Sequence, residues 1–137
     1  NLLYREEERE MIPYCKATGV GIVPWSPIAR GVLSRPWDAR STKREGTDAV
    51  LHRLIRSRET EADKAIVNRV EEIAKKKGTS MAQVATAWCL SKGANPIVGL
   101  SKMDRIDEAV AALQLSLTQD EIEFLEQPYM PKAVDGY

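Results

Sequence analysis

The chain has 137 residues, of which 43% are hydrophobic and 29% are charged, and this is the composition of a single globular domain. Its 20 basic and 20 acidic side chains cancel to a net charge of zero, so charge gives no reason to expect nucleic acid or an anionic membrane as a partner. No apolar run approaches the roughly 18 residues that a membrane helix needs, and no signal segment opens the chain. We therefore expect a cytoplasmic protein without a membrane partner.

The residues that could bind a metal are few and scattered. Cys15 and Cys89 lie far apart in helical apolar patterns, which favours reduced core thiols over a disulfide or a metal site. His52 is the only histidine, and it lies in a basic stretch that holds no neighbouring metal ligand. We predict that the chain has no metal site.

The first part of the chain alternates between extended and helical patterns. Residues 1–4 read like the tail of a strand, and segment 5–18 predicts a helix whose regular part begins near Pro13 and ends at Gly19. The apolar run 20–25 then predicts a buried parallel strand. The polar segment 34–46 has no periodicity and is expected to be a long loop that is either functional or disordered.

Helices dominate the rest of the chain. Apolar residues at helical spacing predict a short helix over 48–56 and a longer one over 60–77. Capping boxes then predict two further helices, one that begins after Ser80 with Gln83 and one that begins after Thr118 with Glu121. The first of these is apolar nearly all round, so it should be buried, with Trp88 inside the protein.

A minimal strand over 96–99 lies between those helices and ends in glycine, with another helix opening after 100. Alternation of strands and helices implies a parallel sheet and the α/β class. Two or three strands cannot complete such a sheet, so we predict that these are the last strands of a larger barrel or open sheet.

Both predicted strands end in segments suited to a ligand. After 20–25, Trp25 offers an indole face for stacking, and the following segment offers a hydroxyl and free backbone N–H groups for phosphate oxygens. The alternative for Trp25 is simple core packing. After 96–99, a glycine, Ser101 and a helix N-terminus together favour an anion.

Several motifs carry a resemblance to a known family. They are Pro24-Trp25-Ser26-Pro27-Ile28-Ala29-Arg30-Gly31, Ala82-Gln83-Val84-Ala85 with Trp88, and Ile97-Val98-Gly99. Together with segment 5–15 they resemble the aldo-keto reductase superfamily, and more narrowly its microbial aryl-alcohol-dehydrogenase-like branch. The resemblance implies a (β/α)8 TIM barrel that binds NADP(H) and reduces aldehydes or ketones. Residues 1–137 look like the C-terminal portion of that single oxidoreductase domain, about the last three strands with their helices.

The resemblance also implies a role for particular residues. Trp25 would stack on the nicotinamide, Arg105 would pair with the 2′-phosphate, and Glu108 would lie near the adenine. The remaining cofactor-binding positions would follow the phosphates: Ser26, Pro27, Ile28, Ala29 and Gly31 along the pyrophosphate, and Gly99 and Ser101 at the adenosine phosphates.

Two positions depart from the family pattern. Ala109 stands where relatives often have an adenine-binding Asn, and Pro36 where many have a phosphate-binding Lys. The missing charge could come from Arg35, or from Arg40, Lys43 and Arg44 in the loop. These departures leave the preference for NADP over NAD open.

The family's catalytic Asp, Tyr, Lys and His lie in its N-terminal half, so no catalytic residue is assigned in this sequence. One hypothesis is therefore the cofactor-binding part of an NADP(H)-dependent aldo-keto reductase with a small-molecule carbonyl substrate. The alternative is a truncated, catalytically inactive protein or interaction module. A regulatory subunit that retains NADPH is a third reading. For residues 1–137 alone, self-association through exposed barrel edges is expected.

Overall fold

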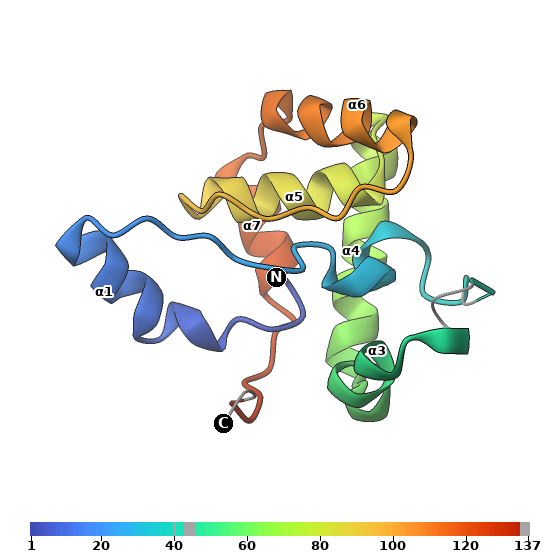
Figure 1. Cartoon of the computed structure of the whole chain (residues 1–137), viewed down its shortest axis with the longest axis horizontal. Helices are drawn as coiled ribbons and strands as arrows, with labels where there is room; N and C mark the ends of the chain where they lie inside the picture. Colours follow the sequence, from blue (N-terminus) through green and yellow to red (C-terminus); the bar gives the residue numbers. More distant parts are fainter. Residues whose placement is uncertain (40, 43–45, 135–137) are drawn as a thin grey trace.

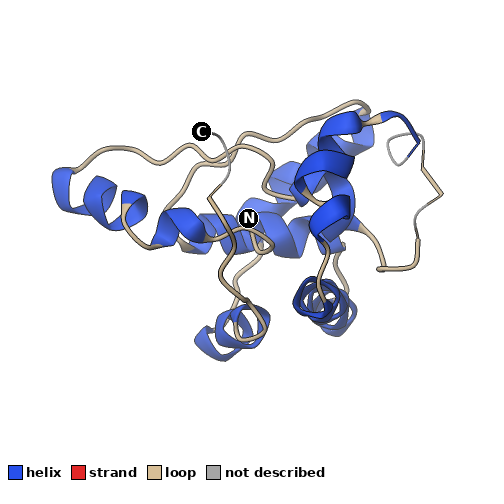
Figure 2. Cartoon of the chain, turned by 90° about the horizontal axis from the view of Figure 1, so that it is seen from below, coloured by secondary structure: helices blue, strands red, loops and turns tan. Residues whose placement is uncertain are grey.

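The computed structural model describes residues 1–39, 41–42 and 46–134, and helices joined by extended segments make up this part of the chain (Figure 1; Figure 2). The α-helices are α1 (Met11–Thr18), α3 (Ala49–Leu54), α4 (Glu61–Lys77), α5 (Met81–Ser91), α6 (Met103–Ala111) and α7 (Gln119–Glu126). Short 3-10 turns are η1 (Glu6–Glu8), η2 (Ala29–Ser34), η3 (Arg56–Arg58) and η4 (Ala112–Gln114).

The predicted helix ends are confirmed. Helix α1 ends at Gly19, which adopts a left-handed conformation with φ of 72°, and Gly78 ends α4 in the same way. Side chains cap the starts of α5 and α7 as reciprocal boxes, Ser80 with Gln83 and Thr118 with Glu121. Each box supplies hydrogen-bond acceptors for backbone N–H groups that have no partner within the helix itself.

The core lies where α5 crosses α4, with α7 against α4 and α6 beside α5 (Figure 1). Fully buried side chains from these helices and from η2 fill it, namely Leu33, Ile66, Val67, Val70, Val84 and Leu125. The prediction that α5 is buried is confirmed, and Trp88 is only 3% exposed. Burial of apolar surface on both sides of α5 is the main force that stabilises this arrangement.

The predictions of regular strands over 20–25 and 96–99 are wrong in their extent. The two segments run parallel, with the Asn95 and Ile97 amides donating to the Ile22 and Pro24 carbonyls at 2.8 and 2.9 Å, but they form only one bridge, between Trp25 and Ile97. The adjacent bridge would need an N–H at position 24 to donate to the Asn95 carbonyl. Since residue 24 is proline and has no N–H, the ladder cannot extend.

The prediction of a strand remnant over residues 1–4 is also wrong. These residues form a turn in which the Tyr4 amide donates to the Asn1 carbonyl at 3.0 Å. Leu2 and Leu3 are buried in the core. Their burial, rather than sheet pairing, explains the apolar character of this segment.

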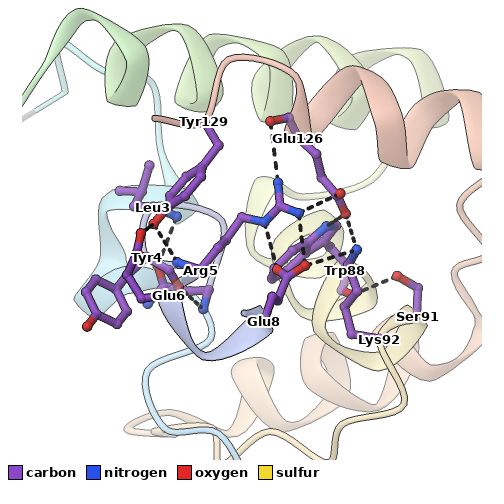
Figure 3. A network of polar contacts seen from close by, with 11 residues as sticks. Leu3, Tyr4, Arg5, Glu6, Glu8, Trp88, Ser91, Lys92, Glu126 and Tyr129 are labelled. Atoms are coloured by element: carbon purple, nitrogen blue, oxygen red, sulfur yellow. Dashed lines mark hydrogen bonds and ion pairs between the residues drawn. The ribbon is translucent and has the colours of Figure 1, made fainter. Parts of the chain in front are cut away.

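A network of charged side chains fastens the N-terminal segment to α5 and α7 (Figure 3). The Arg5 guanidinium lies over the rings of Trp88 and Tyr129 and donates to Glu8 and Glu126 at 2.7 Å. Glu126 also accepts the Trp88 indole N–H at 2.7 Å. Since the partners come from both ends of the chain, this network brings the C-terminal tail beside residues 1–8.

No helix in the described ranges is both long enough and apolar enough to cross a membrane. Part of the predicted loop 34–46 lies outside the described residues. Of its described residues, 35–39 follow η2, and Asp48, two residues beyond the end of this segment, is the N-cap of α3.

Candidate functional site

A cavity of about 460 Å³ lies at the carboxyl ends of the two parallel segments. Its walls come from the segment after Trp25, from α5, from residues 97–100 and from α6. Ligands of α/β proteins bind at this end of parallel strands. The cavity therefore brings together the two stretches that the sequence singled out.

The loop that forms one wall has an unusual backbone. Ser26, Ala29 and Arg30 have positive φ values of 56°, 47° and 53°, a conformation that residues other than glycine rarely adopt. Gly31 follows with φ of 99°. A Cβ at Gly31 would also lie 3.1 Å from an Arg35 guanidinium nitrogen, so both the backbone and the space favour glycine there.

The expectation of free backbone N–H groups in this loop is wrong for three of its residues. The Ala29 amide donates to the Ser26 carbonyl at 2.9 Å, and the Gly31 amide donates to the Ile28 carbonyl at 2.9 Å. The Arg30 amide donates to the Ser26 hydroxyl oxygen at 2.9 Å. These hydrogen bonds shape the loop from within, so side chains must supply much of the polarity that the loop offers to a ligand.

Most of the predicted site residues line this cavity: Trp25, Ser26, Pro27, Ile28, Gly99, Arg105 and Glu108. Trp25 is 60% exposed, which confirms that its indole is not buried in a helical core. Ala29 and Gly31 are buried behind the lining residues, and Ser101 is exposed outside them. Helix α6 begins at Met103 after Lys102 as N-cap, so Ser101 precedes the helix rather than capping it.

The positions that depart from the family pattern have different surroundings. Ala109 lines the cavity on α6, and Arg35 lines it from the loop, whereas Pro36 does not. Arg35 donates to the Thr42 hydroxyl at 3.1 Å. Arg40, Lys43 and Arg44, the other candidates for the missing charge, lie outside the described residues.

The sequence did not single out Gln83, Thr86 or Arg30 as site residues, yet they line the cavity. Gln83 and Thr86 lie three residues apart on α5, so they share a face, and polar residues on an otherwise apolar helix were the available signal. Gln83 donates to the Glu108 carbonyl at 3.2 Å and so links α5 to α6.

A second cavity, of about 540 Å³, shares Trp25, Ser26 and Arg30 with the first. Apolar residues of the segment before Trp25 and of the C-terminal end of α3 line it, including Ile22, Leu54 and Ile55. Lys132 and Ala133 of the tail reach it as well. Trp25 and its neighbours therefore form a wall between two spaces.

Metal-binding clusters of His, Cys, Asp or Glu are absent from the described residues. Cys15 and Cys89 are free thiols. Burial raises the pKa of Cys89, which makes its thiol a weak nucleophile.

Helices packed beside two parallel segments, with a cavity at the carboxyl ends of those segments, define the chain as part of an α/β protein. Residues 1–129 match the model of the Aldo/keto reductase family. The chain therefore belongs to this family.

Relatives of known name extend this result. The chain is 64% identical over 135 residues to the versiconal hemiacetal acetate reductase of Aspergillus parasiticus, covering 98% of this chain and 39% of that protein. It is 55% identical over 138 residues to a candidate aryl-alcohol dehydrogenase of Schizosaccharomyces pombe, covering 99% of this chain and 38% of that protein. The resemblance to the aryl-alcohol-dehydrogenase-like branch is thus confirmed, and the chain spans less than half the length of these relatives.

Solved structures share the fold at lower identity. The glycerol dehydrogenase of Gluconobacter oxydans matches all of this chain and 43% of its own length, with a TM-score of 0.73 and 21% identity. A thermostable aldo-keto reductase solved with the inhibitor epalrestat matches 94% of this chain and 37% of its own length, with a TM-score of 0.66 and 22% identity. The arrangement of helices and segments described above therefore matches part of the fold of each of these two proteins.

Proposed function

We propose that this chain is the cofactor-binding, C-terminal portion of an NADP(H)-dependent aldo-keto reductase, an oxidoreductase that reduces aldehydes or ketones to alcohols. In this proposal residues 1–137 form the last part of a (β/α)8 barrel. The observation that supports it best is the 460 Å³ cavity, which is lined by both Trp25 and Arg105, residues 80 positions apart in sequence. The match to the Aldo/keto reductase family supports it as well.

The lining residues suit the chemistry of a dinucleotide. An exposed indole can stack on a flat ring, and the guanidinium groups of Arg105 and Arg35 can pair with phosphate oxygens in bidentate geometry. When bound, NADPH supplies the hydride for carbonyl reduction. The chain's own part is to orient the nicotinamide against Trp25, with the carbonyl substrate approaching from the neighbouring 540 Å³ cavity.

A catalytically inactive protein or an interaction module is the second candidate. The observation that favours it is the exposure of two apolar side chains of the parallel segments, Val23 at 61% and Ile97 at 60%. Exposed apolar side chains on the parallel segments would then serve self-association, in place of packing against further strands.

The test uses the chain itself and a chimaera in which it replaces the 135 matching residues of the Aspergillus parasiticus reductase. We expect NADPH to quench the fluorescence of Trp25 in both proteins, and the chimaera to oxidise NADPH when an aromatic aldehyde is added. Trp25→Phe should abolish most of the quenching, and Trp37→Phe, outside both cavities, should not. A folded chimaera that neither binds NADPH nor turns over would contradict the proposal.

A further inference from the structure

The strained loop between Trp25 and Ser34 needs an external restraint. Its left-handed residues Ser26, Ala29 and Arg30 are not glycines, and such conformations persist only where the surroundings over-determine them. The hydrogen bonds within the loop restrain its backbone from inside. The Arg30 side chain points outward from that backbone to another element.

That element is the start of α3. The Arg30 guanidinium donates through Nε and Nη2 to Oδ2 of Asp48 at 3.0 and 2.8 Å. The other carboxylate oxygen, Oδ1, accepts the amide N–H of Leu51 at 2.9 Å and thereby caps α3. One carboxylate thus joins the loop to the helix.

This ion pair is well placed to restrain the loop. The side chain of Asp48 is 12% exposed and that of Arg30 is 28% exposed, so water competes with the pair less than it does at an open surface. Arg30 also lines both cavities. A shift of Arg30 would therefore alter the wall between them.

We infer that Asp48 is a positioning residue for the cofactor loop: it holds Arg30, and through Arg30 the left-handed backbone that carries Ser26 and Gly31 past the cofactor. The inference rests on the proposed function, because the loop is a cofactor loop only if NADP(H) binds there. Its consequence is that release of the cofactor is coupled to the start of α3.

Capping of α3 alone would also explain the presence of Asp48, so the test must separate the two roles. Asp48→Asn keeps a good N-cap, because Asn caps helices as well as Asp does, but it removes the charge that faces Arg30. Arg30→Gln removes the pair from the other side and leaves the cap untouched. Asp120→Asn, at an exposed site in the first turn of α7, is the control for loss of one charge.

The first measurement is amide hydrogen exchange in the free chain, which requires no ligand. We expect Asp48→Asn and Arg30→Gln each to accelerate exchange at Arg30, Gly31 and Leu33 about fivefold to tenfold, since the loop opens locally when the pair is lost. The double variant should exchange no faster than either single one, because the two residues act as one unit. The rate of amide exchange within α3 should stay unchanged in both single variants.

The second measurement is the rate of NADPH release from the chimaera, followed by fluorescence. Both variants should release NADPH several-fold faster than the parent, while Asp120→Asn should not. Unchanged loop exchange, or acceleration confined to α3, with normal NADPH binding by the parent would overturn this inference alone. Failure of the parent to bind NADPH would overturn the proposed function, and this inference with it.

Discussion

At the scale of single residues, Arg105 is the side chain on which cofactor preference should depend. It lies in the first turn of α6 and lines the cavity beside Glu108. Loss of a charge-assisted pair with a 2′-phosphate should weaken binding by about 10- to 100-fold. We therefore expect Arg105→Ala in the chimaera to raise the dissociation constant of NADPH by this factor and to leave that of NADH nearly unchanged, as measured by calorimetry.

The exposed Arg53 on α3, which lines neither cavity, provides the matched control. Arg53→Ala should leave the affinity for both cofactors unchanged. An equal loss of NADPH and NADH affinity in Arg105→Ala would show that Arg105 does not recognise the 2′-phosphate.

Glu6 is a buried carboxylate whose ionisation should stabilise the fold. Its pKa is lowered from 4.5 to about 2, because the carboxylate accepts the Tyr129 hydroxyl at 2.6 Å, the Lys132 amide and the Arg9 guanidinium. Since the folded pKa lies below the unfolded one, the stabilisation is complete above about pH 4.5 and is lost as the pH falls towards 2. We expect urea midpoints to fall over this range in the parent and to change less in Glu6→Gln.

Glu6→Gln should also lower the free energy of unfolding at neutral pH by about 1–3 kcal/mol, because its partners lose a charged acceptor. Glu7→Gln, at the exposed neighbouring position, is the control and should behave like the parent at every pH. Parallel pH profiles for Glu6→Gln and the parent would contradict this account.

At the scale of elements, Gln83 connects the stability of a helix with the shape of the cavity. Its Oε1 accepts the Ser80 amide at 2.9 Å within the capping box, and its Nε2 donates to the Glu108 carbonyl on α6. Gln83→Glu should keep the box but lose the donation to α6. We expect a loss of about 1 kcal/mol in unfolding free energy together with weaker NADPH binding by the chimaera.

Thr118→Ala is the control for this prediction, because it breaks the capping box of α7, outside the cavity. It should cost about 1 kcal/mol without any change in NADPH affinity. If both variants bound NADPH like the parent, the link between α5 and α6 would have no role in the site.

The helices could be predicted from the sequence because their signals are local. Ser80 with Gln83 and Gly78 determine helix ends through hydrogen bonds and φ values within a few residues. The extended segments could not, because pairing depends on neighbours: Pro24 stops the ladder, and residues 1–4 turn into the core instead. Likewise the sequence indicated Trp25 and Arg105, but Gln83 and Thr86 join them only because α5 packs against η2 and α6, which places both side chains in the lining of the cavity.

At the scale of the whole molecule, one face of the parallel segments is left uncovered. Val23, Trp25 and Ile97 are 60% exposed or more, although the segments that carry them read as buried strands. In a closed barrel such side chains pack against those of other strands. In a complete reductase this face would pack against further strands, whereas in an interaction module it would be available for self-association.

We therefore expect the 137-residue chain by itself to self-associate and to show no NADPH oxidation with aromatic aldehydes. Burial of the apolar face would drive association, and the unpaired edge of the segments would guide it. Sedimentation at increasing concentration should show oligomers, and Val23→Lys should shift them towards the monomer because a charge then opposes burial of the face. Val50→Lys on α3, away from these segments, should leave association unchanged. A monodisperse monomer with carbonyl-dependent turnover would contradict both expectations, since the chain would then hold a complete active site without any further strands.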